Sequence, residues 1–129
     1  MPLLKIDLIE GRSDAELKTL LDTIHEVVVK SFEVPDGDRY QIVSQHSANE
    51  MIIQDTGLGF KRSDKVVVIS MTSTQRSEKQ KKAFYKMLSE NLKEKCGIDG
   101  RDIMISITTN GAGDWSFGFG KAQFLTGEL

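Results

Sequence analysis

Hydrophobic residues recur at helical spacing in two segments of the chain. Within each segment most apolar positions are three or four residues from the next, which places them on one stripe of an α-helix. The first stripe comprises Leu17, Leu20, Leu21, Ile24, Val28 and Phe32, and the second comprises Phe84, Met87, Leu88, Leu92 and Cys96. Ser13 and Ser77 precede the two segments, each with Glu or Gln three residues later, which is typical of a capping box. The pattern predicts two amphipathic helices.

The two segments repeat one pattern at an offset of 64 residues, which is also the separation of the two serines. The same shift superimposes Phe32 on Cys96, so we expect Cys96 to be a packing residue and not a reactive thiol. Gly97 suits the end of the second helix, and Pro35 limits the first.

Short apolar or alternating runs flank both helices and predict four β-strands. These runs are residues 3–8, 39–43, 66–71 and 103–108. Each half is therefore a βαβ unit, in which the helix connects two parallel strands. We expect one α+β domain over residues 1–129, with two consecutive βαβ units at about 2–46 and 66–109. They would share a four-stranded mixed sheet with both helices on one face.

One face of such a sheet stays uncovered, and a one-sided layer must bury it elsewhere. The run 66–71 is apolar at nearly every position, which predicts a strand buried on both faces. We therefore expect the uncovered face to be apolar and the protein to be a homo-oligomer. The connecting loop 47–65 and the C-terminal tail 110–129 are long for a compact domain, which indicates a functional or partner-ordered role.

Charge and residue content exclude several classes of function. A net charge of −2 gives no electrostatic reason for nucleic-acid binding. The glycine pairs 111/113 and 118/120 lack the pattern of a dinucleotide or phosphate loop. The single cysteine permits no internal disulfide, and no His or Cys pair has the spacing of a metal site. Lys5 and Asp7 interrupt the apolar run that a signal peptide needs. We expect a cytoplasmic protein with no cofactor, metal, nucleic-acid or membrane partner.

Pro2 is a candidate for chemistry. Removal of Met1 would leave a secondary amine at the start of the first strand, where it could act as a base, an acid or an iminium-forming nucleophile. Proline also suits the first position of a strand for structural reasons alone. The second half has Val66 at the equivalent position, so the amine would exist only once in the repeat.

Six segments carry a resemblance to a known family: residues 2–14, 38–43, 51–59, 64–72, 114–118 and 122–129. They are similar to the tautomerase superfamily, and within it to the malonate semialdehyde decarboxylases, and the similarity extends from end to end. The resemblance implies a homotrimer with active sites at subunit boundaries and a small oxo acid as substrate.

The resemblance also implies roles for individual residues. Pro2 would be the catalytic amine, Asp38 its neighbouring carboxylate, and Arg76 the group that binds or polarises the substrate. The apolar wall of the site would be Trp115, Phe117, Phe124 and Leu129. The family has an arginine where this chain has Thr74, so one positive charge is missing from the expected substrate site.

Structural alternatives exist for three of these residues. Asp38 could cap the turn before its strand, as Asp102 could in the second half. Arg76 could lie on the surface, and Trp115 could belong to the core or to an interface.

Three functions fit the sequence. The first is decarboxylation of malonate semialdehyde or a similar 3-oxo acid. The second is keto–enol tautomerisation of 2-oxo acids such as phenylpyruvate, which the loss of an arginine at Thr74 favours. The third is a non-enzymatic interaction protein on the same fold.

Overall fold

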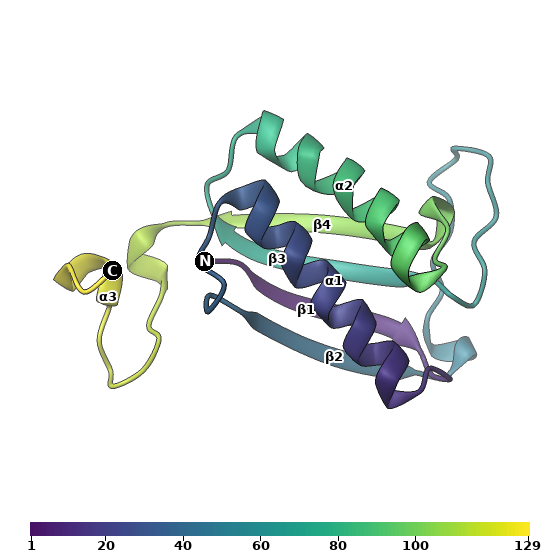
Figure 1. Cartoon of the computed structure of the whole chain (residues 1–129), viewed down its shortest axis with the longest axis horizontal. Helices are drawn as coiled ribbons and strands as arrows, with labels where there is room; N and C mark the ends of the chain where they lie inside the picture. The colour runs from purple at the N-terminus through teal and green to yellow at the C-terminus, as the bar shows by residue number, and fades with distance from the viewer.

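The computed structural model describes all residues from 1 to 129. It contains a four-stranded sheet in the order β2–β1–β3–β4, with two long helices on one face (Figure 1). β1 (Leu3–Ile9) is parallel to β2 (Tyr40–His46), and β3 (Val67–Thr74) is parallel to β4 (Ile103–Asn110). The central pair, β1 and β3, is antiparallel. The predicted mixed sheet of two βαβ units is confirmed.

Both helices begin and end as their sequences predict. α1 (Asp14–Phe32) and α2 (Glu78–Cys96) each have 19 residues and open with a complete capping box on the preceding serine. α2 ends at Gly97, which has a left-handed φ of 65°. α1 ends at Glu33, which adopts the same region with a φ of 53° although it is not glycine.

The core lies between the two helices and the sheet. Phe32 of α1 and Phe84 of α2 are both buried, with ring centroids 5.0 Å apart. Cys96 packs against this core, and burial raises the pKa of its thiol. The packing role expected for Cys96 is therefore confirmed.

The strands extend further than their hydrophobic runs. β2 continues to His46 and β3 to Thr74, because their polar ends keep regular pairing with β1 and β4. A sequence pattern based on apolar residues does not detect such ends, since backbone hydrogen bonds and not side-chain burial hold them.

The uncovered face of the sheet is less apolar than we expected. In β3, Val67, Ile69 and Met71 point to the core, whereas Ser70 and Thr72 point away from it. Strand alternation therefore leaves Val68 as the only apolar residue of β3 on the open face. By the strand register, the open face is mixed. Its apolar residues Leu3, Ile9, Tyr40, Ile42, Val68 and Met104 lie among polar ones that include Lys5, Asp7, His46, Ser70, Thr72 and Ser106. The expectation of an apolar face was wrong in this respect.

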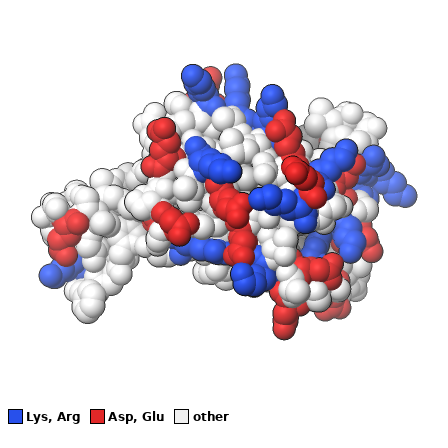
Figure 2. All heavy atoms as spheres, in the orientation of Figure 1, with Lys and Arg blue, Asp and Glu red and all other residues white.

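The C-terminal tail extends beyond the end of the sheet at which the N-terminus lies (Figure 1). It contains the 3₁₀ helix η3 (Ala112–Asp114) and the short α-helix α3 (Gln123–Thr126). The long connection between β2 and β3 contains η1 (Ala48–Glu50), and η2 (Gly100–Asp102) precedes β4. Figure 2 shows charges of both signs interspersed over the main body and few charges on the projecting tail. None of the helices has the length and apolarity that a membrane span requires.

Candidate functional site

The predicted site residues belong to chain segments that meet at one end of the sheet. Leu3 at the start of β1 pairs with Tyr40 at the start of β2 and with Thr72 near the end of β3. Thr74 pairs with Asn110, the last residue of β4. Two parallel pairs joined by an antiparallel centre place the beginnings of β1 and β2 beside the ends of β3 and β4. Four segments that are distant in sequence therefore converge at the N-terminus.

Asp38 lies beside the N-terminus of the chain. Its side chain is buried, with 7% of the residue exposed, and Pro2 is also buried. The Oδ2 atom of Asp38 is 3.8 Å from the N-terminal nitrogen of Met1, which is close enough for an ion pair but too long for a hydrogen bond. No other group donates a hydrogen bond to this buried oxygen. The ion pair with the N-terminal amine is therefore the one polar contact of this oxygen.

The pKa of the N-terminal ammonium reflects opposing influences. Burial is the largest effect and lowers the pKa of the Met1 amine, and the positive charge of Arg76 lowers it further. The carboxylate of Asp38 raises the same pKa, but the balance lies below the ordinary value. An amine in these surroundings loses its proton more readily than an exposed one.

Arg76 is held against the end of α1. Its Nε donates to Ser73 Oγ at 3.1 Å, and its Nη1 donates to the carbonyl of Phe32 at 3.2 Å. The guanidinium also lies over the Phe32 ring, 5.3 Å from the centroid. Burial lowers the pKa of Arg76 and Asp38 opposes this effect, yet an arginine remains charged at neutral pH. Arg76 is thus a half-buried, anchored cation near the N-terminus, which argues against the surface alternative.

Thr74 is the last residue of β3, two positions before Arg76. It is half-buried, and its carbonyl accepts a hydrogen bond from Ser73 Oγ at 2.8 Å. Ser73 itself is fully buried and joins Thr74 and Arg76 through its one hydroxyl. Arg76 is accordingly the positive charge that this strand end provides.

Aromatic side chains from the tail form one cluster around Phe117. Trp115 stacks on Phe117 with centroids 5.5 Å apart and planes at 9°, and Phe124 meets Phe117 edge-on at 5.5 Å. Tyr40 stacks on the same ring at 5.8 Å, which brings the cluster to the start of β2. The Trp115 indole N–H donates to Asn110 Oδ1 at 2.8 Å, so Trp115 is tied to the end of β4 and lies outside the hydrophobic core.

Leu129 is not part of this cluster. It is 61% exposed, and its backbone N–H donates to the carbonyl of Gln123 at 3.3 Å. The structure thus brings together three of the four predicted wall residues and leaves the fourth on the surface of the tail.

Sequence reasoning did not single out Tyr40 or Ser73. Tyr40 lies two residues after Asp38, and burial together with the Asp38 charge raises the pKa of its hydroxyl. Ser73 continues the inward-facing series Val67, Ile69 and Met71. A hydroxyl at a core position of the strand was therefore the feature of the sequence that could have identified it. Such a residue needs a polar partner, and here Arg76 and the Thr74 carbonyl supply it.

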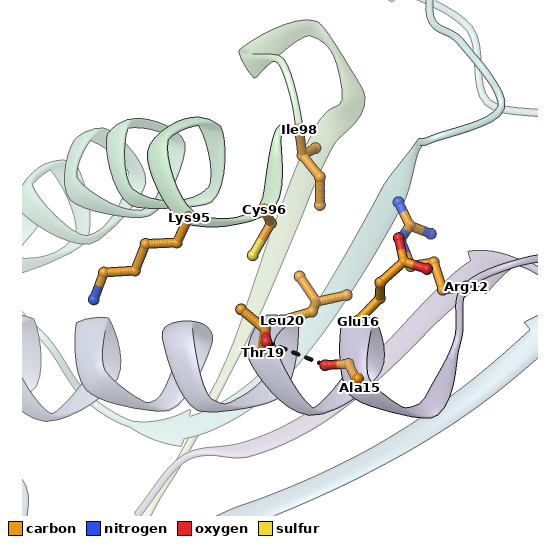
Figure 3. Close-up of a pocket in the computed structure, with 8 residues that line it drawn as sticks. All are labelled: Arg12, Ala15, Glu16, Thr19, Leu20, Lys95, Cys96 and Ile98. Atoms are coloured by element: carbon orange, nitrogen blue, oxygen red, sulfur yellow. Dashed lines mark hydrogen bonds between the residues drawn. The ribbon is translucent and has the colours of Figure 1, made fainter.

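The cavities of the single chain lie away from these residues. Figure 3 shows a cavity of about 310 Å³ between the start of α1 and the end of α2, lined in part by Arg12, Glu16 and Cys96. It is at the opposite end of the sheet from the N-terminus, because α1 follows β1 and β4 follows α2. Pro2 and Asp38 line none of the five main cavities of the chain.

Comparison with known proteins gives consistent results. Two family models that describe tautomerase enzymes match residues 38–118 and 2–61. The probable tautomerase YrdN of Bacillus subtilis (strain 168) is 57% identical over 129 residues, which is 100% of both chains.

Two solved structures are also similar. A malonate semialdehyde decarboxylase is 51% identical with a TM-score of 0.96, covering 98% of each chain. That protein was solved as wild type, as a proline-to-alanine mutant and in an inactivated form, in relation to decarboxylase and hydratase activities. A second malonate semialdehyde decarboxylase, inhibited by 3-bromopropiolate, is 39% identical with a TM-score of 0.94 over 98% of this chain and 97% of that one. The resemblance inferred from the sequence is confirmed.

Proposed function

Because this chain belongs to the tautomerase superfamily and is an enzyme of the decarboxylase or isomerase type, we propose that it decarboxylates malonate semialdehyde or a similar 3-oxo acid. The reaction would use the secondary amine of Pro2, freed by removal of Met1. One observation supports this most strongly: the buried Oδ2 of Asp38 has no hydrogen-bond partner and lies 3.8 Å from the nitrogen of Met1, the residue before Pro2. A buried carboxylate oxygen without a partner is costly, so its persistence points to a functional role.

Removal of Met1 moves the N-terminal nitrogen by one residue, to buried Pro2. The new amine would experience the same three influences as the Met1 amine. Burial and Arg76 favour the neutral form, whereas Asp38 favours the protonated form. For the Met1 amine the balance lowers the pKa, and a neutral amine can act as a base whereas a protonated one can act as an acid.

The proposed reaction divides the work between two charges. Arg76 binds the substrate carboxylate or polarises the carbonyl, and the protonated Pro2 amine donates a hydrogen bond to the aldehyde oxygen. When carbon dioxide leaves, the electron pair of the broken C–C bond moves into the carbonyl group and forms an enolate. The ammonium stabilises the developing negative charge on oxygen. Protonation of the carbon that lost carbon dioxide then gives acetaldehyde.

The aromatic cluster would form the dry wall of this site. Trp115 and Phe124 each contact Phe117, which stacks on Tyr40 at the start of β2. Excluding water strengthens the interactions of the ammonium and guanidinium with the substrate.

We further propose that the enzyme is a homotrimer in which a neighbouring subunit completes each site. Ile42 and Met104 on the mixed open face are 53% and 40% exposed, and Phe119 and Leu125 of the projecting tail are 97% and 68% exposed, so association would bury apolar side chains. Sedimentation at micromolar concentration should give three times the monomer mass. A stable monomer would overturn this assignment.

Keto–enol tautomerisation of a 2-oxo acid such as phenylpyruvate is the second candidate. Thr74 favours it, because this chain lacks the arginine that the resembled decarboxylases have at this position, and tautomerisation needs only an amine that moves a proton between carbon and oxygen beside a bound carboxylate. The similarity to YrdN, named a probable tautomerase, supports the same candidate.

One experiment tests the proposal. The enzyme, with its N-terminus verified by mass spectrometry, is incubated separately with malonate semialdehyde and with phenylpyruvate, and the products are followed by NMR. Acetaldehyde formation at an enzyme-dependent rate supports decarboxylation. Turnover of phenylpyruvate alone would assign the enzyme to the tautomerases instead, and full activity of a preparation that retains Met1 would exclude the Pro2 amine.

A further inference from the structure

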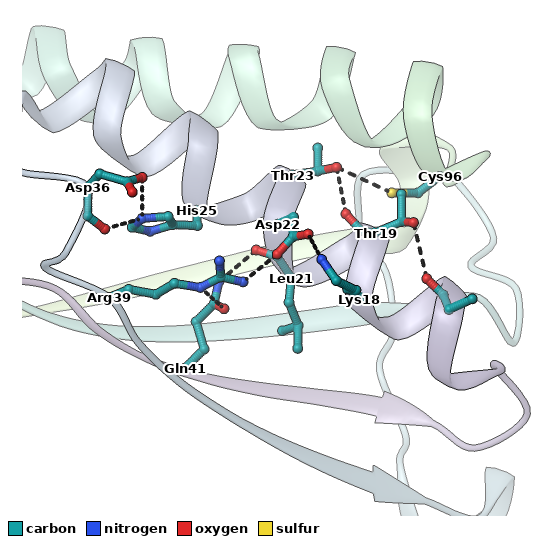
Figure 4. A network of polar contacts seen from close by, with 11 residues as sticks. Lys18, Thr19, Leu21, Asp22, Thr23, His25, Asp36, Arg39, Gln41 and Cys96 are labelled. Atoms are coloured by element: carbon teal, nitrogen blue, oxygen red, sulfur yellow. Dashed lines mark hydrogen bonds and ion pairs between the residues drawn. The ribbon is translucent and has the colours of Figure 1, made fainter.

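The turn that carries Asp38 is attached to α1 by a buried histidine (Figure 4). The Nε2 atom of His25 lies 2.7 Å from the backbone carbonyl oxygen of Asp36. A carbonyl oxygen can only accept, so Nε2 is the donor in this bond. The Asp38 N–H in turn donates to the carbonyl of Pro35 at 3.0 Å, which closes the turn 35–38. His25 therefore holds the turn two residues before the carboxylate.

The other side of Asp38 is attached to the same helix. Arg39 donates to Asp22 Oδ1 at 2.8 Å, and Gln41 donates to the carbonyl of Leu21 at 2.8 Å (Figure 4). The side chains of Asp22 and Arg39 are each 37% exposed, and an ion pair with that exposure contributes little to stability.

His25 differs from these contacts because it is buried. Only 6% of His25 is exposed, whereas the Asp36 carboxylate, 3.3 Å from Nε2, is 95% exposed and surrounded by solvent. The bond to the Asp36 carbonyl is thus the protected one, since water competes poorly for a buried donor.

In the second half of the repeat, the equivalent aspartate is held by hydrogen bonds to its carboxylate. Asp102, the equivalent of Asp38, accepts hydrogen bonds from the Ser63 N–H at 2.7 Å and the Ser63 hydroxyl at 2.6 Å. The residue equivalent to His25 is Ser89. In the second half the Asp102 N–H makes the equivalent backbone bond, to the Asp99 carbonyl at 2.9 Å, and the carboxylate is fixed as well. In the first half the carboxylate is left free and the backbone that carries it is fixed.

We propose that His25 is a positioning residue, which holds the Asp36 carbonyl and thereby sets the place of the Asp38 carboxylate relative to the amine of Pro2. The inference rests on the proposed function, because it assumes that Asp38 acts on that amine. Fixing the backbone leaves both carboxylate oxygens available, which a direct hydrogen bond to Asp38 would not.

Three variants test this role. His25→Leu keeps the volume and removes the donor, whereas His25→Gln keeps an N–H at a similar reach. Thr23→Val is the matched control: Thr23 is 3% exposed on the same helix and donates to the Thr19 carbonyl, but does not contact the turn 35–38. All three are compared for thermal stability, for kcat and KM with malonate semialdehyde, and for the pH dependence of kcat.

We expect His25→Leu to lower kcat about tenfold with a change in KM of less than about threefold, because Asp38 serves the amine and not the substrate carboxylate. The limb of the pH profile that reports the amine should move to lower pH, since a displaced carboxylate no longer favours the protonated form. His25→Gln should restore kcat to within about twofold of the wild-type value. Thr23→Val should lose stability and keep both kcat and the pH profile.

The opposite result is equally clear. If His25→Leu only loses stability, as Thr23→Val does, with kcat and the pH profile unchanged, His25 is structural and the inference fails. If His25→Leu does not fold, His25→Asn, whose shorter amide cannot span to the Asp36 carbonyl, is measured in its place against the same expectations.

Asp38→Asn separates this failure from failure of the proposed function. A fully active Asp38→Asn enzyme with an unchanged pH profile would remove the assumption on which the inference rests. A strongly impaired Asp38→Asn enzyme beside unaffected His25 variants would refute the inference alone.

Discussion

Asp38 and Asp102 occupy equivalent positions in the two βαβ units, yet their carboxylates have opposite surroundings. Both residues are buried, with 7% and 3% exposed. Both oxygens of Asp102 accept hydrogen bonds from Ser63, whereas Oδ2 of Asp38 accepts none and lies beside the N-terminus. Asp102 has a structural role, but it binds Ser63 of the loop before β3 and does not cap the turn before its own strand, where Asp99 is the cap. Nor does the structure support a capping role for Asp38.

Arg12 and Arg76 also occupy equivalent positions and have different surroundings. Arg12 donates to the carbonyl of Lys65 at 2.9 Å in an exposed contact, while Arg76 is anchored on Ser73 and Phe32. The buried carboxylate of Asp102 is thus satisfied by Ser63 of the connecting loop. The end of the sheet at Pro2 gathers groups from both halves and leaves a carboxylate oxygen unsatisfied, as expected where stability has been exchanged for function.

The largest expected effect is at the N-terminus, where the halves differ most. Pro2→Ala replaces the secondary amine with a primary one and removes the ring, and should lower kcat by about 10²- to 10⁴-fold. A protein that retains Met1 should be inactive, because an amide nitrogen cannot accept a proton at neutral pH or form an iminium. Val66→Ala, at the equivalent position of the other half, should reduce thermal stability and preserve kcat. Comparable losses of kcat in both alanine variants would contradict a catalytic role confined to the Pro2 position.

Arg76→Ala should have the next largest effect. Loss of a charge-assisted hydrogen bond to the substrate costs about 1.5–3 kcal/mol, so kcat/KM should fall by about one to two powers of ten. Arg12→Ala removes the equivalent charge from an exposed contact and should leave kcat/KM nearly unchanged. Steady-state kinetics of the two variants measures the difference. If Arg76→Ala proves harmless, the substrate carboxylate binds elsewhere.

Asp38→Asn should mainly change the pH dependence of catalysis, and Asp102→Asn should mainly reduce stability. Asp102→Asn weakens two hydrogen bonds to Ser63 and should reduce the free energy of unfolding by about 1–3 kcal/mol, with kcat nearly unaltered. Asp38→Asn removes a charge that raises the pKa of the N-terminal amine, so that pKa should fall and the corresponding limb of the pH–rate profile should move to lower pH. Denaturant unfolding and pH–rate profiles of both variants check this. A larger stability loss for Asp38→Asn than for Asp102→Asn would contradict it.

Thr74→Arg should give the smallest effect, and it distinguishes the two candidate reactions. A second arginine at the end of β3 should lower the KM for malonate semialdehyde by about tenfold, and less for phenylpyruvate held by Arg76 alone. Glu10→Gln is the control, because it changes the net charge by the same amount at the equivalent position of the first half. An equal change in KM for both variants would show that only the overall charge matters.

The sequence alone determined the elements and their order. Capping serines, helical stripes and strand alternation are local signals, and each reflects interactions within a few residues of chain. They predicted α1, α2 and the βαβ–βαβ order, and the repeat predicted Cys96 as a packing residue. The same signals also placed Pro2 at the start of a strand. They misjudged the open face, because a run of apolar residues hid the alternation that puts Ser70 and Thr72 outside.

Tertiary structure decided which of the two equivalent carboxylates has hydrogen-bond partners. Nothing near Asp38 or Asp102 in the sequence shows that Ser63 binds one of them from 39 residues away, or that the other meets the N-terminus. The contacts of Tyr40 with Phe117 and of His25 with the turn before Asp38 depend in the same way on where the chain returns. Whether a buried carboxylate is satisfied depends on a neighbour brought by strand register and helix packing, and no local pattern encodes that neighbour.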